Sequence, residues 1–198
     1  MTDIFSYLQT DATRFATKAG VTSAFGPLGT GSVAPANTLI VQPFFVGTDG
    51  LTLTACGLLC TGGTGTNIAQ FGVYAVAPPQ SRDVYPKSLV AESNPATYSA
   101  TGIVWSSGWV GGATSIALTN GLYYVAVLVD GGGSRSFGFN QNGYSDASFW
   151  LGFEPVNRTP YFGFHTPHTA GTSLPASFPA GASLFTTSNP QGVFVGMR

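Results

Sequence analysis

The sequence predicts an all-β protein: an antiparallel β-sandwich or jelly-roll-like domain, preceded by a short N-terminal helix and an extended arm. Segments in which apolar and polar residues alternate follow one another at short intervals, as they do in sandwiches. The 198 residues include 27 Gly and 13 Pro, which favour tight turns, and 15 Phe and 8 Tyr, which favour strands. A helical pattern occurs only at the N-terminus, so the rest of the chain is expected to form strands joined by turns.

The N-terminal segment has a pattern of its own. Four apolar residues recur there at helical spacing: Ile4, Phe5, Leu8 and Phe15. We predict a helix whose apolar face docks on a neighbouring subunit; the alternative is a helix that packs on its own domain. Residues 21–37 are rich in Gly, Ser, Thr, Pro and Ala, which predicts a linker or an extended arm. We therefore divide the chain into an anchoring segment, residues 1–37, and a β-sandwich domain, residues 38–198.

Strand patterns begin at residue 38. The first strand, over residues 38–46, contains Pro43, which has no backbone N–H and so predicts an edge or a bulge in that half. Residues 51–60 and 68–77 alternate and predict the next two strands. Shorter strands are predicted over residues 88–92, 103–109, 113–118, 137–140, 149–153, 161–164 and 193–197.

The strongest strand pattern covers residues 122–130. Both of its faces are apolar, which places the strand in the middle of a sandwich or under a subunit contact. Asn120-Gly121 precedes it and is a hairpin signal, because both residues tolerate positive φ.

Charged residues are scarce. Eight acidic and seven basic residues make up 8% of the chain, whereas about a quarter is usual in a soluble domain. Four of the fifteen lie in the first eighteen residues, and residues 93–129 carry none. A net charge of −1 does little to keep copies apart. This composition is typical of a protein whose neighbours are other subunits; a polymer-binding surface is the alternative. Nucleic acid is not an expected partner, because Lys and Arg are not clustered.

Membrane insertion and secretion signals are not predicted either. The longest strongly apolar run, residues 122–129, is too short to cross a bilayer as a helix. The N-terminus has no basic start followed by an apolar stretch, so we expect no signal peptide and synthesis in a cytoplasm.

We predict no catalytic residue, no metal site and no cofactor. Cys56 and Cys60 would lie about 13 Å apart on one extended strand, too far for a disulfide, so we expect buried, reduced thiols. His165 and His168 flank Pro167, which excludes the helix that this spacing would need to hold zinc.

The sequence does not predict a hydrolase or a nucleotide-binding protein either. Residues 132–136 form a glycine turn without a following helix, which predicts a hairpin loop and not a serine nucleophile. Asp146 and Glu154 are eight residues apart, over about 20 Å on a strand, which is too far for a glycosidase pair. Glycine motifs that bind phosphate are absent.

Two tryptophans are candidate ligand-binding residues. Trp105 and Trp109 would share one face if the residues between them stayed extended, and exposed indole rings stack on sugars. The sequence therefore predicts a glycan-binding surface at this pair; the competing interpretation places both rings in the core or in an interface.

The order of strands and turns over residues 38–130, together with two later segments, resembles that of a known class of proteins. Its elements begin with a strand pair over residues 38–46 and 51–60. After it come Phe71-Gly72-Val73-Tyr74, Ser88-Leu89-Val90, Leu118-Thr119-Asn120-Gly121-Leu122-Tyr123-Tyr124-Val125-Ala126, Leu174-Pro175-Ala176-Ser177-Phe178-Pro179 and Val193-Phe194-Val195. This pattern resembles that of tailed-bacteriophage virion surface proteins with a β-sandwich domain, on heads, tail tips or tail fibres.

The resemblance implies a structural protein on the virion surface and no enzyme. Its partners would be other virion proteins and copies of itself, a trimer being suggested by the resemblance alone. One compact domain without a long shaft favours a capsid decoration or head-spike protein over a tail component. The alternative is a host-attachment module of a tail fibre or tail tip, whose partners would include host surface glycans.

Overall fold

The computed structural model describes residues 16–17, 20–22, 28–33, 35–47, 49–76, 85–140, 161–186, 192–193 and 195–197. The predicted N-terminal helix, with Ile4, Phe5, Leu8 and Phe15, and the predicted strand over residues 149–153 lie outside these ranges. The strands are β1 (Ala16–Thr17), β2 (Gly20–Thr22), β3 (Leu28–Val33), β4 (Thr38–Val46), β5 (Leu51–Leu53), β6 (Cys56–Gly62), β7 (Asn67–Val76), β8 (Pro86–Glu92), β9 (Ala96–Tyr98), β10 (Gly102–Trp105), β11 (Ile116–Leu118), β12 (Gly121–Val129), β13 (Ser136–Asn140), β14 (Tyr161–Pro167), β15 (Ser183–Thr186), β16 (Gly192–Val193) and β17 (Val195–Met197). No helix that could span a membrane occurs in the described ranges.

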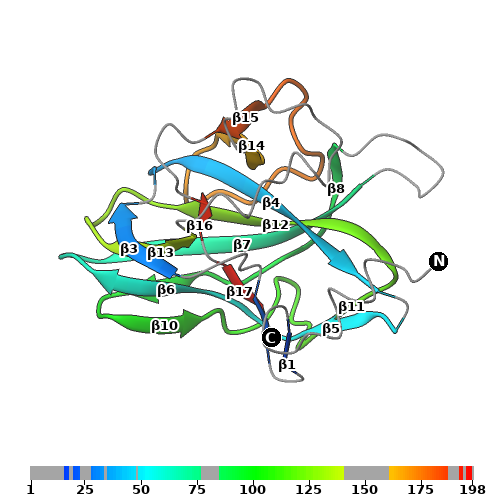
Figure 1. The fold of residues 1–198 in the computed structure, drawn as a ribbon, viewed down its shortest axis with the longest axis horizontal. Helices are drawn as coiled ribbons and strands as arrows, with labels where there is room; N and C mark the ends of the chain where they lie inside the picture. The colour runs from blue at the N-terminus through cyan, green and yellow to red at the C-terminus, as the bar shows by residue number, and fades with distance from the viewer. Residues whose placement is uncertain are drawn as a thin grey trace.

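Two antiparallel sheets pack against each other, which confirms the predicted all-β sandwich (Figure 1). The seven-stranded sheet has the order β15-β14-β4-β12-β7-β8, with β9 also on β7. The eight-stranded sheet has the order β1-β2-β17-β6-β13-β16, with β10 on β6 and β3 on β13. A separate ribbon pairs β5 with β11.

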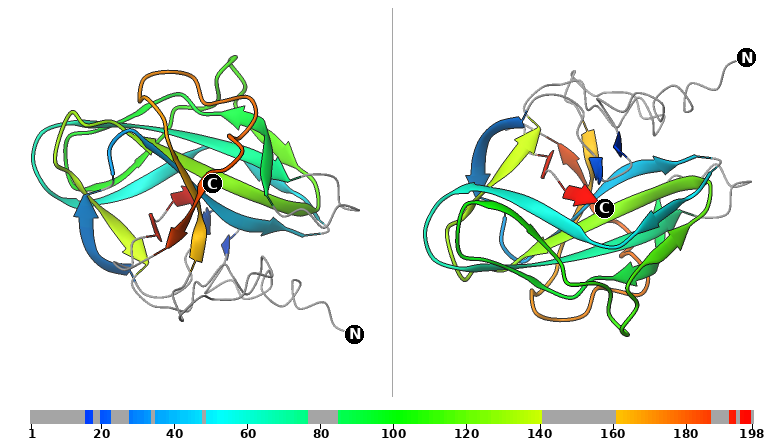
Figure 2. Two further views of the ribbon diagram at one scale, coloured as in Figure 1. Left: turned by 90° about the horizontal axis from the view of Figure 1, so that it is seen from above. Right: turned by 90° about the horizontal axis from the view of Figure 1, so that it is seen from below.

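One long antiparallel ribbon links the two sheets and gives the fold its jelly-roll-like path. Residues 38–62 run against residues 102–129: β4 pairs with β12, β5 with β11 and β6 with β10. The ribbon therefore starts in the seven-stranded sheet, passes through the β5–β11 pair and ends in the eight-stranded sheet. Figure 2 shows its curvature from above and below.

Strand β12 lies between β4 and β7 and is buried on both faces, as its sequence predicts. One face contributes to the core between the two sheets, through Val125, Val127 and Val129. The other face contributes to a second apolar cluster, through Tyr124, Ala126 and Leu128. Packing of the two sheets against each other explains the burial of the first face but not that of the second.

A segment that we call the strap, residues 168–182, covers the second face of β12. Its Leu174 and Phe178 are buried in the second cluster together with Phe164 of β14. In Figure 1 the strap, in orange, lies on the side of the seven-stranded sheet away from β6 and β10. The hydroxyl of Tyr74 donates a hydrogen bond to the Pro175 carbonyl at 2.9 Å, which ties the strap to the sheet.

The strap also covers the edge strand β8. The Leu89 N–H donates to the Ala176 carbonyl at 2.9 Å, and the Phe178 N–H donates to the Lys87 carbonyl at 2.7 Å. Covering an edge with a loop is one way in which proteins prevent it from pairing with other chains. This edge of the seven-stranded sheet is therefore protected.

The prediction for Pro43 is confirmed. Strand β14 pairs with β4 only over Thr38–Val41, so in the half that contains Pro43 the described pairing is with β12 alone. Pro43 stands opposite Tyr124 of β12, and no described strand pairs with it on its other side, as expected for a residue without an N–H.

Three local predictions differ from the structure. Residues 21–37 were expected to form an arm, yet β2 pairs with β17 and β3 with β13, because strand pairing uses backbone groups that even a Gly-rich segment carries. Asn120-Gly121 does not form a hairpin, since β11 and β12 pair with β5 and β4. The loop at residues 130–135 joins strands of different sheets, β12 and β13, so it is not a hairpin loop either.

Candidate functional site

The cysteines are buried and free, as predicted. Cys56 and Cys60 both lie on β6, with their side chains in the core between the sheets. Burial raises the pKa of the Cys56 thiol to about 12. A thiol in this environment stays protonated at neutral pH and is inert as a nucleophile.

The two histidines do not converge on a metal site within the described ranges, where no group of three potential ligands occurs. His165 and Pro167 are part of β14, and the ring of His168 lies at the start of the strap. The His168 Nε2 atom is 3.1 Å from the Ser173 carbonyl oxygen and 3.2 Å from the Thr172 hydroxyl oxygen. These contacts hold the beginning of the strap in place.

The structure separates the two tryptophans that were predicted to share a face. Strand β10 ends at Trp105, and the chain turns at Gly108, whose φ is +111°. Trp109 is 1% exposed and its indole N–H donates to the Leu53 carbonyl at 3.1 Å. The predicted glycan-binding role is therefore wrong for Trp109, because neither face of its ring is accessible to a sugar. For Trp105, whose half-buried ring lies over Gly57, that role stays a prediction.

Trp109 has a structural role instead. It lies in the loop between β10 and β11, where the long ribbon changes sheets, and its ring fills the core at this corner. The backbone N–H of Trp109 donates to the Ala113 carbonyl at 3.1 Å, and the backbone N–H of Gly112 donates to the Trp109 carbonyl at 3.2 Å. The Val110 N–H donates to the Glu92 carbonyl at 2.7 Å, which fixes the loop to the end of β8.

A polar network that the sequence did not indicate joins three loops. The buried Asn67 amide donates to the Asp130 carboxylate at 3.1 Å and to the Gly133 carbonyl at 3.2 Å. The guanidinium of Arg135 donates to the carbonyls of Gly63, Gly65 and Ser99. The charged groups of Asp130 and Arg135 thus stabilise the loops, so we assign this network a structural role.

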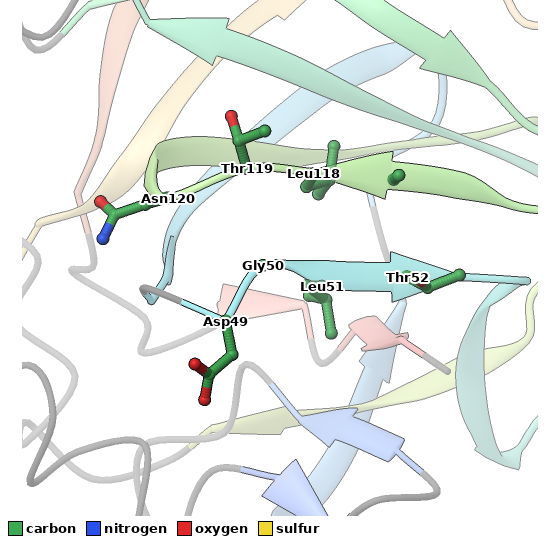
Figure 3. Close-up of a pocket in the computed structure, with 8 residues that line it drawn as sticks. Asp49, Gly50, Leu51, Thr52, Leu118, Thr119 and Asn120 are labelled. Atoms are coloured by element: carbon green, nitrogen blue, oxygen red, sulfur yellow. The ribbon is translucent and has the colours of Figure 1, made fainter.

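A shallow hollow of about 310 Å³ lies where the long ribbon is interrupted (Figure 3). Residues 49–52 line one side and residues 117–120 the other. The pairing of the ribbon stops where Val46 faces Gly121 and resumes where Leu51 faces Leu118. Between these pairs the Gly50 N–H donates to the Gly47 carbonyl at 3.0 Å, which closes a turn. The polar side chains here are exposed and the hollow is open, so it assigns no ligand.

Strand β10 is an edge of the eight-stranded sheet with a different character from β8. Within the described ranges it pairs only with β6, and in Figure 1 it lies directly below β6 on the left. Val104 packs against the core, so Ile103 points to the outer face, where it is 52% exposed. β10 contains no charged residue and no proline, and no part of the strap covers it.

Charges in the described part of the chain lie at a few positions: Asp49, Lys87, Glu92, Asp130 and Arg135. Glu92 accepts a hydrogen bond from Gln70 at 3.1 Å, and the Lys87 Nζ atom lies 5.8 Å from the centre of the Tyr85 ring. All of them lie outside residues 93–129, which build β9, β10, β11 and β12. The β10 edge and the loops beside it in sequence thus carry no charged side chain of their own, while the Arg135 guanidinium reaches the Ser99 carbonyl in the loop before β10.

No family model matches the chain, and no curated protein matches it. The fold and the uncharged β10 edge are therefore the observations on which a function can be based.

Proposed function

We propose that the protein is a structural subunit of a bacteriophage particle. In this proposal its N-terminal segment docks on a neighbouring virion protein, and its sandwich is displayed on the virion surface as a capsid decoration or head spike. The observation that carries the assembly role is the absence of charged side chains from residues 93–129, together with the exposure of Ile103 and Val110 within this segment. The phage particle itself comes from the resemblance of the strand pattern to virion surface proteins.

An uncharged surface is well suited to contacts between subunits. Burying a charge in an interface requires a partner charge in good geometry, whereas hydroxyl, amide and apolar groups are less costly to remove from water. Ile103 and Val110, which are 52% and 57% exposed, add apolar area to this surface. A monomer that stays apart from its copies would be expected to carry charges at such positions.

Deleting residues 1–15 tests the docking role, because this deletion leaves every described strand in place. We expect the truncated protein to fold but to be absent from particles that are assembled with the other virion proteins of the phage that encodes it. Circular dichroism and urea denaturation report folding, and the protein content of purified particles reports incorporation.

Point variants of the full-length chain control for the deletion. Replacing Ile4, Phe5, Leu8 and Phe15 together with Ser should also prevent incorporation, whereas replacing Thr2, Thr10 and Thr13 with Ala should not. Normal incorporation of the truncated, folded protein would contradict the proposal.

A further inference from the structure

The strap occupies the edge of β8 in the way that a bound peptide strand would. Its Ser177 stands opposite Ser88 of β8, and one backbone hydrogen bond flanks this pair on each side. Main-chain pairing at a sheet edge, with pockets for side chains beside it, is the geometry by which sheets bind extended peptides. The β8 edge is therefore a binding site that this chain fills with its own residues.

Two pockets on the seven-stranded sheet determine which segment fits this site. Leu174 lies over Gly72 of β7, where an added Cβ atom would come within 2.5 Å of a Leu174 methyl group. Phe178 packs edge-on against the rings of Tyr74 and Tyr85. Within the sequence, a leucine precedes a phenylalanine by four positions only at Leu174 and Phe178. No other segment of the chain offers the same pair of side chains at this spacing.

The middle of the strap can leave its site without breaking a pair between strands of the sheets. The flanking strands β14 and β15 pair with each other, with His165 opposite Ser183, so the strap is the loop of a hairpin. Gly171 and Gly181 have φ of +82° and +78°, and a Cβ atom on either would meet nothing within 4 Å. Loop residues that can absorb a large change in φ and ψ are typical hinges, and glycine allows such a change most readily. Residues 172–180, between these two hinges, are therefore the segment that can move.

We propose that two copies of this chain exchange their straps, so that residues 172–180 of each copy fill the β8 site of the other. The exchanged straps make the same backbone bonds and fill the same pockets as they do in a single chain, so the dimer needs no additional interface. A second copy is the occupant because it supplies the segment that lies in this site, with Leu174 and Phe178 buried. This inference goes beyond the proposed function, since it concerns contacts between copies and not the docking of the N-terminal segment.

The length of the moving segment and the charges of β8 are compatible with this exchange. The segment between the hinges spans at most about 30 Å when extended, so its middle reaches about 15 Å from them. The two β8 edges must therefore face each other. Strand β8 carries one charge of each sign, Lys87 and Glu92, so two such edges do not repel each other on balance. Because closure within one chain does not depend on concentration, exchange is favoured where copies are crowded, as on a particle.

Cross-linking between two cysteine variants of the purified full-length protein tests the exchange. Ser88 and Ser177 are exposed, and in an antiparallel pair flanked by hydrogen bonds the Cα atoms lie about 4.5 Å apart, which permits a disulfide. In an equimolar mixture of Ser88→Cys and Ser177→Cys, one of them isotopically labelled, the variants are joined at this pair where the strap of one copy lies on β8 of the other. The natural cysteines are buried and do not compete. We expect a disulfide-linked dimer with one chain of each variant, identified by mass spectrometry, in a yield that rises with protein concentration.

Thr52→Cys mixed with Ala117→Cys is the matched control. These residues are also exposed and opposite each other, but they belong to the long ribbon, which could exchange only if the sheets came apart. This mixture should give only the background of chance collisions. A mixed-dimer yield from the strap pair that does not exceed this background at the highest concentrations would overturn the inference.

Alanine at both hinges is a second test. Gly171→Ala together with Gly181→Ala, added to both strap variants, strains the closed strap because alanine rarely adopts positive φ, while the added atoms meet no neighbour. The exchanged form can relax at the hinges, so the yield of mixed dimer should rise about fivefold or more. An unchanged or lower yield would contradict the exchange. The docking of the N-terminal segment would still be judged by particle incorporation, so the two proposals fail separately.

Discussion

Two side-chain hydroxyl groups accept hydrogen bonds from backbone N–H groups of β6. The buried Tyr98 hydroxyl accepts from the Leu58 N–H at 2.8 Å and donates to the Val104 carbonyl at 2.7 Å. The Ser106 hydroxyl accepts from the Cys56 N–H at 3.2 Å. These side chains satisfy backbone groups that would otherwise be buried without a partner, which costs about 1–3 kcal/mol per group. Burial raises the pKa of Tyr98, so its hydroxyl stays protonated as this arrangement requires.

The buried thiol of Cys56 should make stability fall at alkaline pH. Burial raises its pKa from 9.0 to about 12, so between these pH values the unfolded chain loses a proton that the folded protein retains. The free energy of unfolding should therefore fall by about 1.4 kcal/mol more in wild type than in Cys56→Ala between pH 8 and pH 10. Urea denaturation of both proteins measures this difference, and an equal loss in both would contradict it.

Strand β6 is the element that joins the parts of the eight-stranded sheet. It pairs with β10 on one side and with β13 and β17 on the other. Gly57 allows this close approach: a Cβ atom there would lie 2.5 Å from the Val104 carbonyl oxygen and 3.0 Å from the Trp105 ring. The sequence showed only an alternating strand, because the need for glycine arises from the neighbouring strand.

Gly57→Ala should destabilise the protein by about 2 kcal/mol or more, since a backbone atom of β10 has to move. Gly62→Ala on the same strand is the matched control, because a Cβ atom there meets nothing within 4 Å. That substitution should change stability by less than about 0.5 kcal/mol. Equal effects in urea denaturation would show that β10 adapts without cost.

At the scale of the whole molecule, the fold has two apolar clusters and not one. The first lies between the sheets, and the second lies between the seven-stranded sheet and the strap. The ring of Phe178 packs edge-on against Tyr74 and Tyr85, with centroid distances of 5.4 and 5.7 Å. The strap is therefore an integral layer of the domain, and it keeps β8 from pairing with other chains.

Phe178→Ala should reduce stability by about 3–5 kcal/mol, the usual range for a buried phenylalanine. Because the substitution also loosens the cover of β8, we expect the variant to aggregate more readily than wild type. Urea denaturation and light scattering measure the two effects. Ser177→Ala, an exposed position on the same strap, should alter neither; a stable, soluble Phe178→Ala variant would show that the strap is dispensable.

The local alternation of side chains was enough to predict the fold class, most strands from β4 to β14, the buried thiols, the edge position at Pro43 and the burial of β12 on both faces. These features follow from a repeat of two residues, which the chain carries by itself. Trp105 and Trp109 could not be told apart in this way, because their burial depends on where the chain turns between them. The hollow, the strap over β12 and the position of β10 beside β6 all arise between segments far apart in the chain, such as residues 38–62 and 102–129. Pairing over such distances depends on register and on which strand lies beside which, and neither is encoded in any one segment.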